Sequence, residues 1–103
     1  MKIVRVTYTT RVEYAEKNQA NIRQVMADLQ QINNSGINYN CCLNPDGKSF
    51  THTAFFNSEE AEKVLLNLPS FKSFQQQLQA GGIETPPKQE LLSLVGSSKD
   101  MFN

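Results

Sequence analysis

The amino-acid sequence predicts a single α+β domain with the element order β, α, β, β, α, β and a four-stranded antiparallel sheet. Four segments alternate between apolar and other residues with the period of two that strands show, and two further segments carry apolar residues at helical spacing. Gly, Pro and Asn clusters separate several of them. The 103 residues fit one domain, without repeats or a linker.

The first half of the chain is predicted to hold a strand, a helix and a second strand. Lys2 to Thr10 alternates and is rich in β-branched residues, which is typical of a strand. Between Tyr14 and Asn33 the apolar residues lie on one helical face, and Asn34 to Gly36 supplies a stop. Ile37 to Leu43 alternates again and is expected to be the first arm of a hairpin.

The hairpin continues through a turn into a third strand and a helix. Asn44 to Gly47 reads "NPDG", in which proline fixes φ and Gly47 tolerates a positive φ. Ser49 to Phe56 forms the returning strand. Asn57 or Ser58 is then expected to cap a helix whose first turn is acidic, which suits the positive end of the helix dipole.

Prolines divide the last third of the chain. Pro69 interrupts the second helix, and apolar spacing resumes until Gly81, so two helical pieces are predicted. Because Pro86 and Pro87 do not suit a central strand, "IETPPKQE" is expected to be a loop, with the last strand running from about Gln89 to Gly96. Residues 1–96 then form the domain, and residues 97–103 form a C-terminal tail.

This order is the ferredoxin-like βαββαβ arrangement, in which both helices pack on one face of the sheet. The period of two divides the strand residues between the faces. The more apolar set is expected beneath the helices; its members are Val4, Val6, Tyr8, Ile37, Tyr39, Cys41, Leu43, Phe50, His52, Ala54, Phe56, Leu92 and Leu94.

The other set mixes apolar and polar side chains and suits a hydrogen-bonded contact between the sheets of two copies. It contains Arg5, Thr7, Thr9, Asn38, Asn40, Cys42, Thr51, Thr53 and Phe55. Arg5 lies in mid-strand, where a charge needs a partner or water, so a contact across a dimer is expected, with anion binding as an alternative.

Composition and charge argue against several classes of function. Lys plus Arg equals Asp plus Glu, and no run of like charge suggests nucleic acid as a partner. No apolar run is long enough to span a membrane, and the start of the chain alternates, so a cytoplasmic protein is expected. The adjacent Cys41 and Cys42 lack zinc or CxxC spacing, so neither a metal nor a disulfide is expected.

The segment "FFNSEEAEKVLLNLPSFKSFQQQL" resembles the dimeric α+β barrel superfamily, and within it the antibiotic biosynthesis monooxygenase family. Members commonly end the third strand in an aromatic residue, follow it with a capped acidic start, and break the helix before a "P-x-F-x-x-F" piece. Here Phe56, the range Asn57 to Ala61, and Pro69 with Phe71 and Phe74 match. The coarse likeness covers Lys2 to Gly96.

The resemblance implies a homodimer whose two sheets face each other as a barrel, with a pocket between sheet and helices in each subunit. It also implies oxygenation of a small hydrophobic or aromatic metabolite without a metal or organic cofactor, because an electron-rich deprotonated substrate reduces dioxygen itself. The absence of tryptophan favours an alternative, a non-catalytic homodimer that binds a small ligand or serves in stress. Whether the protein is an enzyme stays open.

His52, the single histidine, is the candidate catalytic residue, as a base or an orienting donor. The period of two places it on the same face of the sheet as Tyr8 and Tyr39. These two tyrosines are expected to bind the substrate together with Phe50, Phe56, Phe71 and Phe74. The alternative for all of these residues is a structural role. His52 would then be a buried histidine that is hydrogen-bonded to a tyrosine, the tyrosines would be core residues, and the phenylalanines would form the core under the second helix. A third, weaker hypothesis is a redox sensor that uses Cys41 or Cys42.

Overall fold

The structure is a computed structural model that describes residues 1–102. Its elements follow the predicted order, so the ferredoxin-like α+β class is confirmed. They are β1 (Lys2–Thr10), a 3-10 turn η1 (Val12–Tyr14), α1 (Ala15–Ile32), β2 (Ile37–Leu43), β3 (Ser49–Phe56), α2 (Glu59–Leu66), α3 (Pro69–Gln77), a π-helical turn η2 (Leu78–Gly82) and β4 (Ile83–Leu92).

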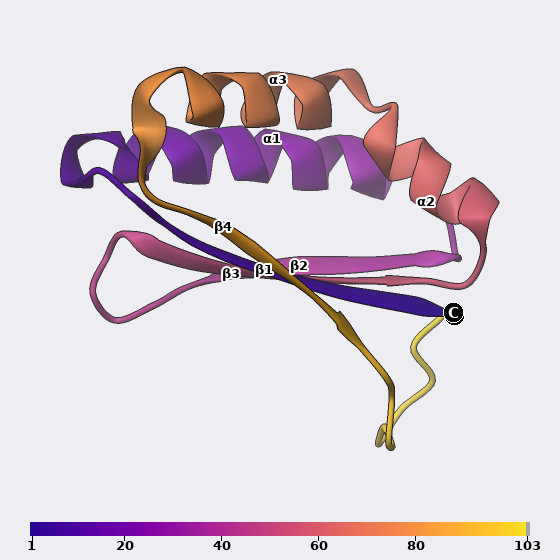
Figure 1. Cartoon of the computed structure of the whole chain (residues 1–103). Helices are drawn as coiled ribbons and strands as arrows, with labels where there is room; N and C mark the ends of the chain where they lie inside the picture. Colours follow the sequence, from indigo (N-terminus) through magenta and orange to yellow (C-terminus); the bar gives the residue numbers. More distant parts are fainter. Residues whose placement is uncertain (103) are drawn as a thin grey trace.

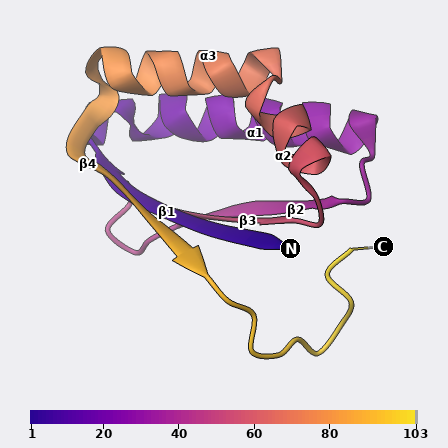
Figure 2. The same cartoon turned by 45° about the vertical axis from the view of Figure 1, so that its right-hand side comes forward.

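The four strands form one antiparallel sheet in the order β2-β3-β1-β4. Figure 1 shows α1, α2 and α3 above a single face of this sheet. The view turned by 45° in Figure 2 keeps the helices on that same side. The protein therefore has two layers, and no helix of residues 1–102 covers the second face of the sheet.

Strand register sets which side chains share the inner face. Val6 lies opposite His52 and Tyr8 opposite Phe50 in the β1–β3 pair, while Tyr39 lies opposite Ala54 in the β2–β3 pair. Paired residues point to the same face of a sheet. The buried cluster follows from this register; it consists of Tyr8, Ile22, Val25, Phe50, Ala54, Phe56, Ala61, Leu65, Leu68, Phe71, Phe74 and Leu78.

The last strand differs from the prediction, because it runs from Ile83 to Leu92 and not from Gln89 to Gly96. β4 is an edge strand, and an edge tolerates proline, which lacks a backbone N–H. Pro86 and Pro87 lie where the pairing with β1 shifts register, between the pairs Thr9–Thr85 and Thr7–Lys88. The segment expected to be a loop is therefore a bulged edge strand.

The same difference changes the predicted faces. Leu92 lies opposite Ile3, so it points to the outer face, and Leu94 follows the end of β4. Both are exposed, by 39% and 41%, so their assignment to the core was wrong. Leu43, at the end of β2, is also exposed rather than buried. On the outer face, Ile3 is buried.

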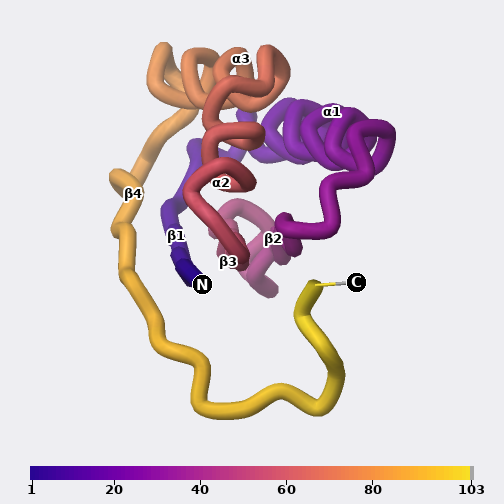
Figure 3. Tube along the Cα trace, turned by 90° about the vertical axis from the view of Figure 1, so that its right-hand side faces the viewer, coloured from indigo at the N-terminus to yellow at the C-terminus, as the bar shows by residue number. Residues whose placement is uncertain are grey.

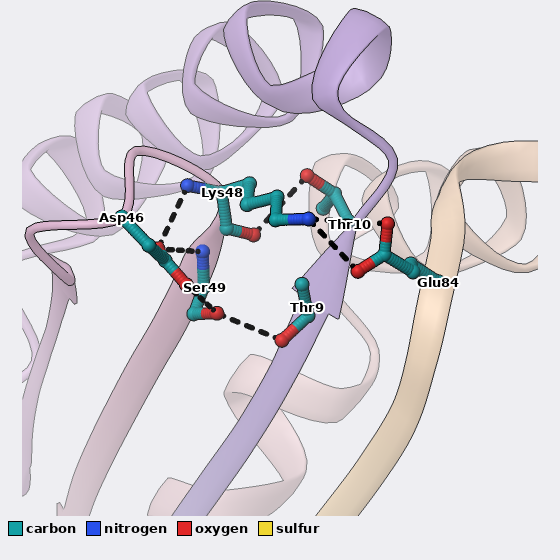
Figure 4. Close-up of polar contacts among 6 residues, drawn as sticks. All are labelled: Thr9, Thr10, Asp46, Lys48, Ser49 and Glu84. Atoms are coloured by element: carbon teal, nitrogen blue, oxygen red, sulfur yellow. Dashed lines mark hydrogen bonds and ion pairs between the residues drawn. The ribbon is translucent and has the colours of Figure 1, made fainter.

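Side chains fix the hairpin turn and tie it to β1 and β4. Asp46 accepts hydrogen bonds from the backbone N–H groups of Lys48 and Ser49 and from the Ser49 hydroxyl, which itself lies 2.7 Å from Thr9 Oγ1 (Figure 4). Lys48 Nζ lies 3.0 Å from Glu84 at the start of β4. Gly47 has a φ of 77°, as the turn predicts.

The ends of the helices follow the predictions, except that α1 ends one residue early. Ser58, and not Asn57, caps α2, since its Oγ accepts from the Ala61 N–H. Pro69 stands in the first turn of α3, where its missing N–H costs no hydrogen bond. Asn33, one residue before the predicted stop, ends α1 with a φ of 53°.

Arg5 and the tail both approach the outer face. Arg5 is paired within its own chain, since its Nη2 lies 2.8 Å from Glu90 Oε1 on β4. After β4 the chain turns back beneath the sheet (Figure 3). Asn38 Nδ2 donates to the backbone carbonyl of Met101, 3.1 Å away. Of the predicted tail, residue 103 lies outside the described residues.

Candidate functional site

A cavity of about 340 Å³ lies between the inner face of the sheet and the helices α2 and α3. This volume is within the range of small-molecule sites. Its walls are mainly apolar: Val4, Val6, Ala54, Phe56, Leu65, Leu66, Phe71, Phe74, Leu78 and Pro87. Its polar lining consists of Tyr8, Tyr39, His52, Glu62, Gln75, Gln79 and Gln89.

The structure brings most of the predicted site residues to this cavity. Tyr8, Tyr39 and His52 lie on its sheet wall, and Phe56, Phe71 and Phe74 complete the aromatic lining. Phe50 does not line the cavity. It is buried, and its ring stacks on Tyr8 with the ring centroids 5.5 Å apart. His52 thus stands at the wall of an open space and not inside a filled core.

Both ring nitrogens of His52 have a tyrosine partner. The hydroxyl oxygen of Tyr8 lies 2.8 Å from Nε2, and that of Tyr39 lies 2.6 Å from Nδ1. Three adjacent strands hold this trio, because Tyr39 is on β2, His52 on β3 and Tyr8 on β1. Phe74 of α3 packs against the imidazole with the centroids 5.6 Å apart. The ring is therefore fixed in position on several sides.

Burial sets the protonation states of this wall. Desolvation lowers the pKa of His52 to about 4, so the imidazole is neutral at neutral pH. Burial also raises the pKa of Tyr8 and of Tyr39 above the ordinary range, so both phenols keep their protons. The wall offers uncharged hydrogen-bonding groups to anything that enters the cavity.

Asn18 belongs to the same network, although it was not among the predicted site residues. It lies on α1, is fully buried, and its Nδ2 donates to the Tyr8 hydroxyl oxygen at 2.9 Å. The signal in the sequence was its spacing: Asn18, Ile22 and Val25 lie on one face of the helix, where an apolar residue is expected.

The mouth of the cavity is marked by its exposed lining residues. Gln75 and Gln79 of α3 and the following turn lie on one side, and Pro87 and Gln89 of β4 on the other. Glu62 also lines the cavity, and its carboxylate forms an ion pair with Lys2 Nζ at 2.8 Å. Entry therefore lies between α3 and the edge strand.

The described residues show neither a cluster of metal ligands nor a membrane-spanning helix. No three His, Cys, Asp or Glu side chains of residues 1–102 gather as the ligands of a metal ion would. Within the same part of the chain, no helix has the length and hydropathy needed to cross a membrane.

Comparison with solved structures confirms the resemblance at the level of the fold. An antibiotic biosynthesis monooxygenase matches with a TM-score of 0.75 and 12% identity over 93% of this chain and 100% of that chain. A mutant of SnoaB, a cofactor-independent oxygenase from Streptomyces nogalater, matches with a TM-score of 0.68 and 14% identity over 96% of this chain and 98% of that chain.

A third structure, PA3566 from Pseudomonas aeruginosa, matches with a TM-score of 0.75 and 18% identity over 92% of this chain and 94% of that chain. No family model matches the sequence, and no curated protein matches it significantly. At these identities the similarity establishes the shared fold.

Proposed function

We propose that the cavity binds a small, largely apolar or aromatic metabolite and that the protein oxygenates it as a cofactor-independent monooxygenase. The observation that carries the proposal is the cavity itself, whose apolar lining converges on the uncharged wall of Tyr8, His52 and Tyr39. The name of SnoaB as a cofactor-independent oxygenase supports it, since the two chains share a fold.

The proposed reaction balances without a further reductant. A substrate methylene flanked by electron-withdrawing groups reacts with dioxygen, one oxygen atom becomes a carbonyl on that carbon, and the other leaves as water with the two methylene hydrogens. The substrate first loses one of these hydrogens as a proton to bulk water, and the resulting carbanion or enolate supplies the electrons. The protein contributes orientation, a dry cavity and hydrogen bonds to the substrate oxygen on which negative charge develops.

Within this proposal His52 is an orienting group rather than the base. Moving a proton from a substrate as acidic as a phenol, with a pKa of about 10, to His52, with a pKa of about 4, is uphill by roughly 8 kcal/mol. Tyr8 and Tyr39 also lie against its two nitrogens. A phenol that keeps its proton suits the stabilisation of a substrate oxyanion.

The occupied nitrogens of His52 also favour a second candidate function, a ligand-binding protein without catalysis. Such a protein needs the apolar cavity and a polar anchor but no group that exchanges protons. The two functions share the cavity and differ only in turnover.

The test combines oxygen uptake with binding, using a panel of anthrones and quinols. Gln75→Trp places a large side chain at the mouth, and Gln76→Trp, an exposed neighbour outside the cavity lining, is the matched control. Uptake that Gln75→Trp slows and Gln76→Trp preserves supports the oxygenase. Binding without uptake supports the second function, and absence of both contradicts each.

We also propose that the protein forms a homodimer through the outer face of the sheet. No helix of residues 1–102 covers this face, and side chains such as Thr53 and Phe55 are only half-buried on it. Leu92, which lies opposite Ile3 on the same face, is exposed by 39%. A second copy would remove this apolar surface from water.

A further inference from the structure

Asn18 is a fully buried polar residue that the proposed reaction does not use. Burying an amide is costly unless its groups are hydrogen-bonded. Its Nδ2 donates to Tyr8, but its Oδ1 has no partner among residues 1–102. Asn18 is the first residue of a hydrogen-bond network that continues through Tyr8 and His52 to Tyr39, so the reason for burying its amide is sought in that network.

The orientation of this amide follows from counting donors. With Nδ2 toward Tyr8, Oδ1 and one of the two N–H groups have no partner among the described residues. Exchanging Oδ1 and Nδ2 would pair Oδ1 with the Tyr8 hydroxyl. It would also leave the whole NH2 group buried without a hydrogen-bond partner. Unpaired buried N–H groups are rarer in proteins than under-satisfied acceptors. Asn18 therefore donates to Tyr8.

This donation decides the direction of the next bond. A hydroxyl has one hydrogen to give. Tyr8 is 4% exposed, and its hydroxyl oxygen has two partners, Asn18 Nδ2 and His52 Nε2. Since Asn18 is a donor, Nε2 is the acceptor left for the Tyr8 hydrogen. If Nε2 instead donated to the Tyr8 oxygen, the hydroxyl hydrogen of Tyr8 would be buried without an acceptor.

The last bond then runs from histidine to tyrosine. With Nε2 accepting, neutral His52 carries its hydrogen on Nδ1, which donates to the Tyr39 hydroxyl oxygen at 2.6 Å. Among the described residues Tyr39 has no other side-chain hydrogen-bond partner, and it lines the cavity. Its own hydrogen is left for whatever occupies the cavity.

We propose that Asn18 is a positioning residue: through Tyr8 it holds His52 in the Nδ1–H tautomer, and Tyr39 thereby becomes the donor to an oxygen of the ligand. The part concerning the ligand rests on the proposed function. The chemical class it selects is an apolar ring system that carries a hydrogen-bond acceptor, such as a carbonyl or phenolate oxygen, at the point facing β2.

The tautomer is measured directly by ¹⁵N NMR of the imidazole, because the chain holds a single histidine and the signals need no assignment among several. The wild-type protein is expected to show a protonated Nδ1 and an unprotonated Nε2. A protonated Nε2 in the wild type would overturn the proposal. This result does not depend on any ligand.

Asn18→Asp tests the role of the amide, since an ionised carboxylate only accepts hydrogen bonds. Spectra are taken from about pH 6 to about pH 10, because burial delays ionisation of the new carboxyl group. The tautomer should switch to Nε2–H as that group ionises. Retention of Nδ1–H throughout would remove Asn18 as the positioning residue. Asn21→Asp, one turn along α1 and bonded to Gln77, should keep Nδ1–H.

The donor role of Tyr39 is tested with two probes, 1-tetralone and tetralin, which differ only in that a carbonyl of the first replaces a methylene of the second. Tyr39→Phe should weaken binding of 1-tetralone by about tenfold, the worth of one hydrogen bond, and leave tetralin unchanged. Equal effects on the two probes would contradict the donor role. If neither probe binds the wild type, the ligand class fails, and the tautomer measurement still decides the role of Asn18.

Discussion

The Nδ1 atom of His52 lies 2.6 Å from the hydroxyl oxygen of Tyr39, and this contact joins β3 to β2 on the inner face of the sheet. Burial among aromatic rings disfavours charge on the imidazole. The folded protein therefore favours the neutral form of His52, and acidification should lower the stability of the fold.

The protein is expected to lose stability as the pH falls from about 6.5 to about 4, because the unfolded chain binds a proton that folded His52 resists. The folded pKa lies below the unfolded value, so the contribution is complete above pH 6.5 and is lost on acidification. The loss from this group is roughly 3 kcal/mol. Urea unfolding at both ends of this range measures it.

His52→Gln supplies the control for this pH dependence, since glutamine does not titrate. Carboxyl groups titrate alike in both proteins, so the difference between their pH profiles isolates the imidazole. Identical losses in the two proteins would show that His52 is not the titrating group.

Gly36→Ala is expected to destabilise the fold by about 1 to 3 kcal/mol, the usual cost of forcing extra atoms into a packed site. A Cβ on Gly36 would stand 2.3 Å from Asn57 Oδ1 and 3.1 Å from the Ala61 Cβ. The Asn57 N–H also donates to the Gly36 carbonyl, which limits how far the two segments can separate. Chemical denaturation measures the change.

Asn57→Ala added to Gly36→Ala should recover part of this loss, because it removes the nearest atoms while the Ala61 contact remains. Gly96→Ala, which meets no atom within contact distance, is the matched control. A Gly36→Ala protein as stable as the wild type would contradict the packing at this junction.

Sedimentation at micromolar concentration is expected to show a dimer. Phe55→Glu should shift it to monomer, because a charge buried in an apolar contact without a partner is costly. Lys72→Glu, on the exposed side of α3, should leave the dimer intact. A wild-type monomer would contradict the proposed assembly and the role given to the outer face.

Cys41 is expected to resist alkylation in the folded protein. Burial raises the pKa of its thiol to about 12, and the thiolate is the reactive form. In a Cys42→Ser protein, the native rate should be about a thousandfold below the rate in urea, where the pKa returns to about 8.5. Rapid native modification, or oxidation by mild peroxide, would contradict this expectation and support the redox-sensor hypothesis.

Local patterns predicted the fold wherever burial alternates cleanly. β3 is the best example, since Phe50, His52, Ala54 and Phe56 are buried and the residues between them are not. β4 was misplaced because its sequence carries the marks of a loop, and only its position at the sheet edge explains why two prolines fit. Edge position is set by tertiary contacts and is invisible to local sequence.

The site was partly predictable for the same reason. The alternation within each strand placed Tyr8, His52 and Tyr39 on one face of the sheet. The strand register then brings them within hydrogen-bonding distance. Asn18 was not predicted because it lies on α1, in the helical layer, and contacts Tyr8 of the sheet. The periodicity of a single segment does not predict contacts between layers. Arg5 was given a partner in a second copy because Glu90 was not expected beside it.

The bulged start of β4 has a consequence for how the sheet meets other chains. An edge strand normally offers a row of backbone donors and acceptors on which a further strand can grow. Pro86 and Pro87 lack a backbone N–H, so this stretch offers fewer donors, and the shift in register bends the strand. This edge is thereby guarded against strand-by-strand aggregation. β2, which contains no proline, is the edge at which a fibril-forming contact would begin.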